Sequence, residues 1–140
     1  MIKQAHWVEL LKSLDEPLAI TLASNHEMSL ESMRRCVDEF FNRVERNALG
    51  TRWHLKPLGE RLKVVGFFEH LDSNIHMHAA VEAPGRAPSV LVNGAWTWRE
   101  VRRGGSYLCE PITGAWDWYI TKDLTPANAD ERLYLRVGRL

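Results

Sequence analysis

The sequence predicts a single α+β domain in which a central, mostly antiparallel β-sheet is flanked by helices. The length of 140 residues suits one compact domain with one hydrophobic core. Segments of strand composition alternate with segments of helical spacing, and two strand segments are separated only by a short polar turn, as in an antiparallel hairpin. No repeat, low-complexity tract or interdomain linker interrupts the chain, so we expect residues 1–140 to form one domain.

The first strand and the first helix have the clearest patterns. Residues 17–24, PLAITLAS, predict a strand centred on Ile20, Thr21 and Leu22. Residues 29–50 predict a helix, because apolar residues recur at helical spacing between a serine that can cap its start and a glycine that can end it. Those positions are Ser29, Leu30, Met33, Val37, Phe40, Phe41, Val44 and Gly50.

The middle of the chain predicts a hairpin. Residues 61–71 and 74–83 have strand composition, and the turn-forming tripeptide DSN lies between them. We therefore expect these two strands to pair antiparallel. Residues 84–89 are rich in Pro and Gly and predict a loop.

The last third of the chain is less regular. Residues 90–105 show no single pattern, and we expect a short helix near residues 94–102. Residues 106–112 predict another strand, and residues 113–124 predict a helix that begins at Thr113. A polar break and a short alternating tail follow. The expected order is therefore β-α-β-β-(α)-β-α.

Composition places the chain among soluble globular proteins. Hydrophobic residues make up 45% and charged residues 26% of the chain, and both values are ordinary for that class. No apolar stretch approaches the roughly 18–20 residues of a membrane span. Residues 1–17 are amphipathic and contain acidic residues, unlike a signal or transit peptide, so we expect a cytoplasmic protein.

Charge and cysteine content argue against two further classes. The formal net charge is zero, which argues against a protein that coats duplex DNA through electrostatics alone. Cys36 and Cys109 are far apart and form no CxxC motif, so we expect buried, reduced thiols. Basic side chains still cluster locally, although acidic residues interleave with the first group, as on a solvated helix face. The groups are Arg34, Arg35, Arg43 and Arg46, then Arg52 and Lys56, then Arg99, Arg102 and Arg103.

Two histidines stand one residue apart in an apolar run. Residues i and i+2 of a strand point to the same face, so His76 and His78 share a face. The hairpin brings Glu69 back beside them, near the end of the preceding strand. Two imidazoles and one carboxylate can hold a divalent metal and leave positions open for water and substrate, which is typical of a catalytic metal site.

Other interpretations of this pair remain open. His-x-His is a short pattern that often arises by chance, and both histidines can simply be structural. His70 and His54 also lie nearby in the sequence, so the choice of ligands is not unique.

A tyrosine and a lysine lie three residues apart in the last predicted helix. Tyr119 and Lys122, in the sequence WDWYITKDL, are neighbours on one helical face. A phenol with a pKa of about 10 becomes a good nucleophile near neutral pH only where positive charge favours the phenolate. Lys122 and a metal can both supply that charge. Alternatively, Tyr119 is a half-buried structural residue and Lys122 an ordinary solvated charge.

Taken together, these motifs resemble the HUH endonuclease superfamily, which comprises Rep-type and relaxase-like nickases of single-stranded DNA. The similar parts are LAITLAS, the helix at 29–49, VVGFFE with Glu69, NIHMHAAV with His76 and His78, and YITK with Tyr119 and Lys122. They occur in the family's order from residue 18 to about residue 124. The resemblance implies a Rep nuclease fold with a palm like that of ferredoxin or RRM domains, and the one tyrosine in the YITK motif places the chain with the single-tyrosine enzymes.

The resemblance also implies a mechanism. Glu69, His76 and His78 would hold Mn²⁺ or Mg²⁺, and Tyr119 would attack a phosphodiester of single-stranded DNA, with Lys122 positioning the phosphate. The product would be a 5′-phosphotyrosine and a free 3′-hydroxyl, and ATP would not be needed. Such a nickase would start rolling-circle replication of a plasmid or phage from an origin hairpin or exposed strand. A host helicase is a further implied partner.

Four other residues are candidates for DNA contact. Asn25 and His26 follow the first strand, where related Rep proteins contact DNA. Arg52 can pair with phosphates, and Trp53 is one of several tryptophans that can stack on unpaired bases.

Three alternatives remain beside the Rep interpretation. One is a single-tyrosine transposase of the same superfamily. Another is a non-catalytic Rep-like module that only binds DNA or metal. The third is a metal hydrolase unrelated to DNA, in which Tyr119 has no role.

Overall fold

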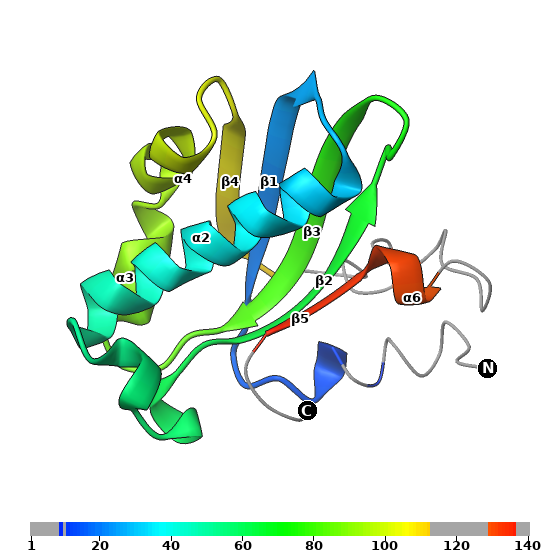
Figure 1. The fold of residues 1–140 in the computed structure, drawn as a ribbon. Helices are drawn as coiled ribbons and strands as arrows, with labels where there is room; N and C mark the ends of the chain where they lie inside the picture. Colours follow the sequence, from blue (N-terminus) through cyan, green and yellow to red (C-terminus); the bar gives the residue numbers. More distant parts are fainter. Residues whose placement is uncertain (1–8, 10, 113–128, 137–140) are drawn as a thin grey trace.

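The fold is that of a computed structural model, which describes residues 9, 11–112 and 129–136. Five strands form one sheet in the order β4-β1-β3-β2-β5, and all four neighbouring pairs are antiparallel. β3 lies at the centre, between β1 and β2, so the hairpin predicted from the sequence occupies the middle of the sheet (Figure 1). The strands are β1 (Leu18–Glu27), β2 (Lys63–Glu69), β3 (Asn74–Glu82), β4 (Ser106–Pro111) and β5 (Leu133–Arg136).

One long helix crosses one face of this sheet. α2 (Leu30–Leu49) begins where the Ser29 side chain accepts a hydrogen bond from the backbone N–H of Ser32, and it ends at Gly50, whose φ of 93° suits a residue without a Cβ. Both ends confirm the sequence prediction. Its apolar stripe is fully buried and forms the main core with the sheet. That stripe comprises Met33, Val37, Phe40, Phe41 and Val44.

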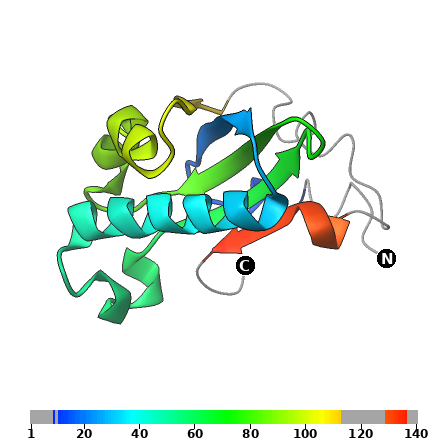
Figure 2. The ribbon, with the colours of Figure 1, turned by 45° about the horizontal axis from the view of Figure 1, so that its top comes forward.

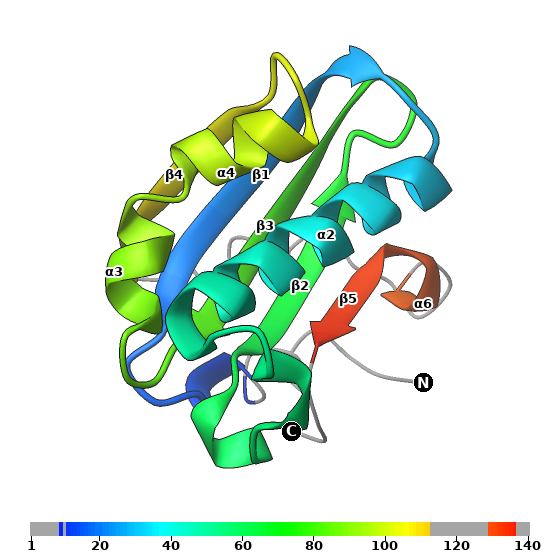
Figure 3. The same ribbon diagram turned by 60° about the vertical axis from the view of Figure 1, so that its left-hand side comes forward.

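Shorter helices complete the same layer. α3 (Ala87–Val92) and α4 (Ala95–Val101) lie beside α2 on the same face of the sheet (Figure 3). The single-turn helices η1 (Trp53–Leu55) and η2 (Leu58–Glu60) join α2 to β2, and α6 (Ala129–Arg132) leads directly into β5. Figure 2 shows the sheet behind α2, with α3 and α4 alongside. Among the described residues, no helix is long and apolar enough to cross a membrane.

The other face of the sheet carries a smaller apolar cluster. Leu11 and Leu14 pack there against Val65, Phe67 and Ala80. Successive side chains of a strand point to opposite faces of the sheet. The neighbouring residues Val64, Phe68 and Met77 therefore belong to the main core beneath α2. We call the side away from α2 the open face of the sheet.

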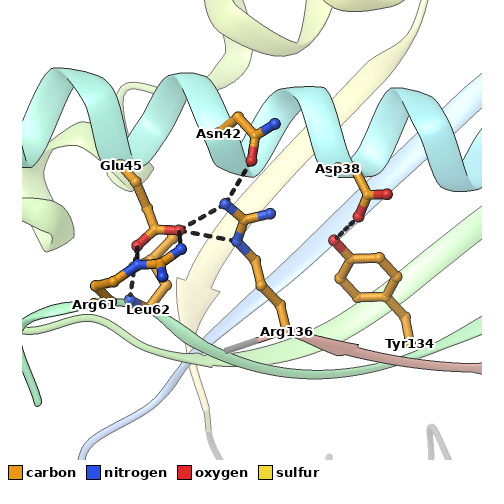
Figure 4. Close-up of polar contacts among 7 residues, drawn as sticks. All are labelled: Asp38, Asn42, Glu45, Arg61, Leu62, Tyr134 and Arg136. Carbon is orange, nitrogen blue, oxygen red and sulfur yellow. Dashed lines mark hydrogen bonds and ion pairs between the residues drawn. The ribbon is translucent and has the colours of Figure 1, made fainter. Parts of the chain in front are cut away.

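Buried ion pairs attach β5 to α2. Glu45 is 1% exposed and accepts hydrogen bonds from the guanidinium groups of Arg61 and Arg136, at 3.0 and 2.6 Å for the shortest contacts (Figure 4). Arg136 also donates to Asn42, and the Tyr134 hydroxyl donates to Asp38 over 2.6 Å (Figure 4). A buried carboxylate is tolerated because two cations and the backbone N–H of Leu62 satisfy its oxygens.

The structure confirms most predicted elements and corrects two details. The short helix expected near residues 94–102 is α4, and both cysteines are free thiols, although each is half-buried and not buried as predicted. The loop expected at residues 84–89 is shorter than predicted, because α3 begins at Ala87 with a proline in its first turn, where a missing N–H costs nothing. The tail contains a fifth strand, β5, that the predicted order omitted. The helix predicted at residues 113–124, with Thr113, lies outside the described residues.

Candidate metal centre

The predicted ligands come from the two central strands and share the open face. Glu69 is the last residue of β2 and lies directly opposite His76 on β3. His78 follows two residues later and therefore points to the same side. Ile75 and Met77 point to the α2 side and are fully buried. The predicted hairpin and its common face for Glu69, His76 and His78 are thus confirmed.

Glu69 and His78 are already in contact. The Oε2 atom of Glu69 is 3.3 Å from Nε2 of His78, and their side chains are only 17% and 16% exposed. Two donors bound to one ion with bonds of about 2.1 Å are roughly 3.0–3.4 Å apart when they subtend an angle near 100°. The observed distance therefore fits both a hydrogen bond and two adjacent ligands of one cation.

Thr21 holds the other side of the His78 ring. Its Oγ1 atom is 3.2 Å from His78 Nδ1, across the β1–β3 pair. When Nδ1 carries the proton and donates it to this hydroxyl, Nε2 keeps a free lone pair that faces Glu69. Thr21 was not among the site residues predicted from the sequence. Its only signal was a polar residue at the centre of an apolar strand.

His76 is the third predicted ligand. Its ring centre is 6.0 Å from that of His78. Two neighbouring imidazoles bound to one ion at angles of 90–110° place their centres about 4.5–5.3 Å apart, since each metal–nitrogen bond is about 2.1 Å, so these two rings would have to move slightly closer to share an ion. Burial lowers the pKa of His76, and the neighbouring His78 and His70 lower it further, while Glu69 acts in the opposite direction. A lowered pKa favours the neutral imidazole that a metal requires.

The ligand group is only partly assembled. Within the described ranges, no three His, Cys, Asp or Glu side chains are already arranged as a complete metal-binding group. Glu69 and His78 are placed as a pair, and a third donor must turn toward them. His76 is positioned for this by its register opposite Glu69. The donors present, two imidazoles and a carboxylate, are suited to a divalent ion.

The two other histidines near this motif in the sequence have different positions. His70 directly follows Glu69, and its ring centre is 5.2 Å from that of His76. His54 lies in η1, which is at the opposite end of the sheet from the turn between β2 and β3 (Figure 1). Of these two histidines, only His70 therefore lies beside the candidate centre.

Asn25 and His26 were predicted to follow the first strand, but they lie within the last part of β1, at the same end of the sheet as the histidine pair. Asn25 has a left-handed φ of 57°, and its side-chain amide donates to the carbonyl of Gly104 and to the hydroxyl of Ser106. Its backbone N–H donates to Asn74, two residues before His76. His26 is exposed and packs over Gly104. A shallow cavity of about 540 Å³ opens here, lined by Asn25, His26, Glu27, Asp72, Ser73 and Asn74.

Arg52 and Trp53 are not brought to the candidate centre. Arg52 precedes η1 and is exposed, at the far end of the sheet. Trp53 is half-buried, and the guanidinium carbons of Arg61 and Arg136 lie 5.2 and 5.8 Å from its ring centre. The visible role of Trp53 is therefore to cover the buried ion pairs of Glu45. Tyr119 and Lys122 lie outside the described residues.

Comparison with known proteins supplies no relative. No protein-family model, curated protein or solved structure matches this chain. Any statement about its activity therefore depends on the residues and geometry described above.

Proposed function

We propose that this chain is a metal-dependent nickase of single-stranded DNA, of the HUH type. The observation that carries the proposal is the contact between Glu69 and His78 on the open face, with His76 directly opposite Glu69. This is the placement that the acidic residue and the His-hydrophobic-His motif require if they are to bind one ion. A divalent ion bound there would polarise the scissile phosphate and stabilise the negative charge that develops on its oxygens.

The strand order supports the proposal. β1 and β2 run parallel to each other with β3 inserted between them, and α2 makes the crossover. With α3 and α4 before β4, the order β-α-β-β-α-β follows the ferredoxin-like arrangement, in which the sheet reads 4-1-3-2. This order supports the palm that the resemblance to Rep nucleases implies. One fold can carry many functions, so the proposed function depends on the residues of the open face.

We propose Tyr119 as the nucleophile. Ile112, which precedes Tyr119 in the chain, and Leu133, which follows it, both pack on the apolar cluster of the open face. The chain between these two residues is long enough for a phenol at position 119 to reach the histidine pair. The phenolate oxygen attacks phosphorus, the bond from phosphorus to the 3′-oxygen breaks, and that oxygen takes a proton from solvent. Lys122 binds the phosphate or favours the phenolate.

The biological role that fits this chemistry is the initiation of rolling-circle replication of a plasmid or phage. A 5′-phosphotyrosine retains a reactive phosphodiester, so a later 3′-hydroxyl can reverse the step and reseal the strand without ATP. The substrate is an origin hairpin or exposed strand, and unwinding would be supplied by a host helicase. Transposition by a single-tyrosine enzyme uses the same chemistry and is the nearest alternative.

The test is a labelled-oligonucleotide assay with Mn²⁺. Random single-stranded pools are labelled at the 3′ end, because the 5′-phosphotyrosine product keeps the 3′ part of the strand attached to the protein. We expect a covalent protein–DNA band that requires Mn²⁺ and disappears in Tyr119→Phe and Glu69→Gln. His54→Ala is the matched control and should retain the band.

Other outcomes separate the alternatives. Cleavage without a covalent band that survives in Tyr119→Phe would overturn the proposal in favour of a metal hydrolase. Binding of the pool without cleavage would overturn it in favour of a non-catalytic module.

A further inference from the structure

We infer that His70 is a fourth ligand of the candidate metal centre, so that the site takes a transition-metal ion in preference to Mg²⁺. This inference rests on the proposed metal centre and deepens it by specifying the class of ion. The contacts of His70 support it. Its Nε2 atom is 3.8 Å from Glu69 Oε2, the same carboxylate oxygen that lies 3.3 Å from His78 Nε2.

The backbone at His70 explains how two consecutive residues can serve one site. Successive side chains of a strand point to opposite faces, so His70 would lie on the α2 side if β2 continued. Instead, β2 ends at Glu69, and His70 adopts a left-handed φ of 58°. This conformation is uncommon for a residue other than Gly, although Asn, Asp and His adopt it more often than the rest. It places the His70 ring beside the histidine pair, with its centre 5.2 Å from that of His76.

The surroundings of His70 favour a cation. A cavity of about 600 Å³ opens next to it, lined by Glu69, His70, Leu71, Asp72, Ser73, Glu131 and Arg132. Three of these side chains are carboxylates and one is a guanidinium, so the cavity carries net negative charge near neutral pH. Both Glu69 and His70 line this cavity, and the His70 side chain is 60% exposed whereas that of Glu69 is 17% exposed. An ion can therefore reach the site from solvent at this point.

Four donors of this kind determine which ion is preferred. Mg²⁺ prefers an octahedral shell of oxygen atoms, whereas imidazole nitrogens suit later divalent metals. A set of one carboxylate and three imidazoles should therefore bind Mn²⁺ and Co²⁺ much more tightly than Mg²⁺. The 5.2 Å between the ring centres of His70 and His76 falls within the range of about 4.5–5.3 Å expected for neighbouring imidazoles on one ion, and the 6.0 Å between His76 and His78 would have to shorten slightly.

The test measures metal affinity directly and does not need DNA. Mn²⁺ binding to the full chain is followed by the electron paramagnetic resonance signal of free Mn²⁺, and Mg²⁺ affinity is obtained by competition. The variant is His70→Asn, because Asn tolerates a left-handed backbone and removes the imidazole without new strain. His54→Ala is the matched control, and melting without metal checks that each variant is folded.

We expect His70→Asn to bind Mn²⁺ at least about tenfold more weakly, as ligand loss should cost no less than loss of an outer-shell partner. The ratio of Mn²⁺ affinity to Mg²⁺ affinity should also be lower in His70→Asn than in the wild type, because an amide replaces one nitrogen donor. A purely structural role of His70 would not change that preference.

Two outcomes would overturn the inference, and they are distinguishable. If His76→Ala and His78→Ala lose Mn²⁺ while His70→Asn binds it as the wild type does, the metal centre stands and His70 is not a ligand. If the wild type binds no Mn²⁺, the inference fails together with the metal centre on which the proposed function depends.

Discussion

Thr21 lies directly opposite His78 across the β1–β3 pair, and its hydroxyl oxygen is 3.2 Å from the Nδ1 atom of that histidine. On the other side of the ring, Nε2 faces the carboxylate of Glu69 at 3.3 Å. The imidazole therefore lies between a hydroxyl that can accept a hydrogen bond from Nδ1–H and the Glu69 carboxylate, with which it would share the proposed cation. A hydrogen-bond partner on the ring nitrogen that does not bind the metal, as Thr21 is here, fixes both the orientation and the tautomer of a metal-binding histidine.

Removing the Thr21 hydroxyl should weaken metal binding without unfolding the protein. We expect Thr21→Val to reduce Mn²⁺ affinity by about 10- to 100-fold, because the His78 ring loses the partner that fixes its tautomer. Valine has a similar shape and a high strand propensity, so the melting temperature of the metal-free protein should change little. Thr21→Ser retains the hydroxyl and is the control. Equal Mn²⁺ affinity of Thr21→Val and the wild type, measured by titration, would contradict this role.

Removing the carboxylate of Glu45 should destabilise the fold strongly. Glu45→Ala leaves the guanidinium groups of Arg61 and Arg136 without their buried partner, and their side chains are only 16% and 10% exposed. Loss of one member of such a buried pair costs about 3–5 kcal/mol in the free energy of unfolding. Urea denaturation followed by tryptophan fluorescence measures this change.

Glu39→Ala is the matched control for Glu45→Ala. Glu39 lies in the same helix and pairs with Arg43, but both side chains are substantially exposed. Its loss should cost less than about 1 kcal/mol. If the two variants lose similar stability, the buried ion pairs do not contribute as the structure indicates.

Alkaline pH should unfold the protein through its buried phenols. Burial raises the pKa of Tyr134, and its hydrogen bond to Asp38 raises it further; burial also raises the pKa of Tyr107. A phenol in the unfolded chain ionises near pH 10, whereas these two remain protonated in the folded state. Their contribution to stability is therefore fully present below about pH 10 and is lost as the pH rises above it.

Tyr134→Phe tests the pH dependence. The variant should be about 1 kcal/mol less stable at pH 8, because it loses a hydrogen bond, and its stability should fall less steeply between pH 9 and 11. The measurement is the free energy of unfolding as a function of pH. The same slope for both proteins would show that Tyr134 ionises freely in the folded state.

Local sequence patterns predicted most of the candidate centre. The alternation of NIHMHAA and the DSN turn were enough to place Glu69, His76 and His78 on one face, because strand alternation and hairpin pairing are local properties. Thr21 could not be found this way. It is 57 residues from His78 in the sequence, and only the pairing of β1 with β3 brings the two together.

Other features also depended on distant contacts or on backbone conformation. β5 has only four residues, and it is held at the sheet edge by Tyr134 and Arg136, which contact α2 more than 90 residues away in the sequence. A strand so short has almost no signal of its own. The left-handed conformation of His70 was likewise not predicted, because His adopts it more often than most residues but still in a small minority of cases.

The central claim is that one divalent ion binds between β2 and β3 on the open face of the sheet. The most direct measurement is anomalous X-ray diffraction from crystals of the protein grown with Mn²⁺. We predict one strong anomalous peak about 2.0–2.3 Å from Glu69 Oε2 and from a ring nitrogen of each of His76 and His78. A structure in which these side chains contact only one another at saturating Mn²⁺, or in which the ion binds elsewhere, would contradict the claim.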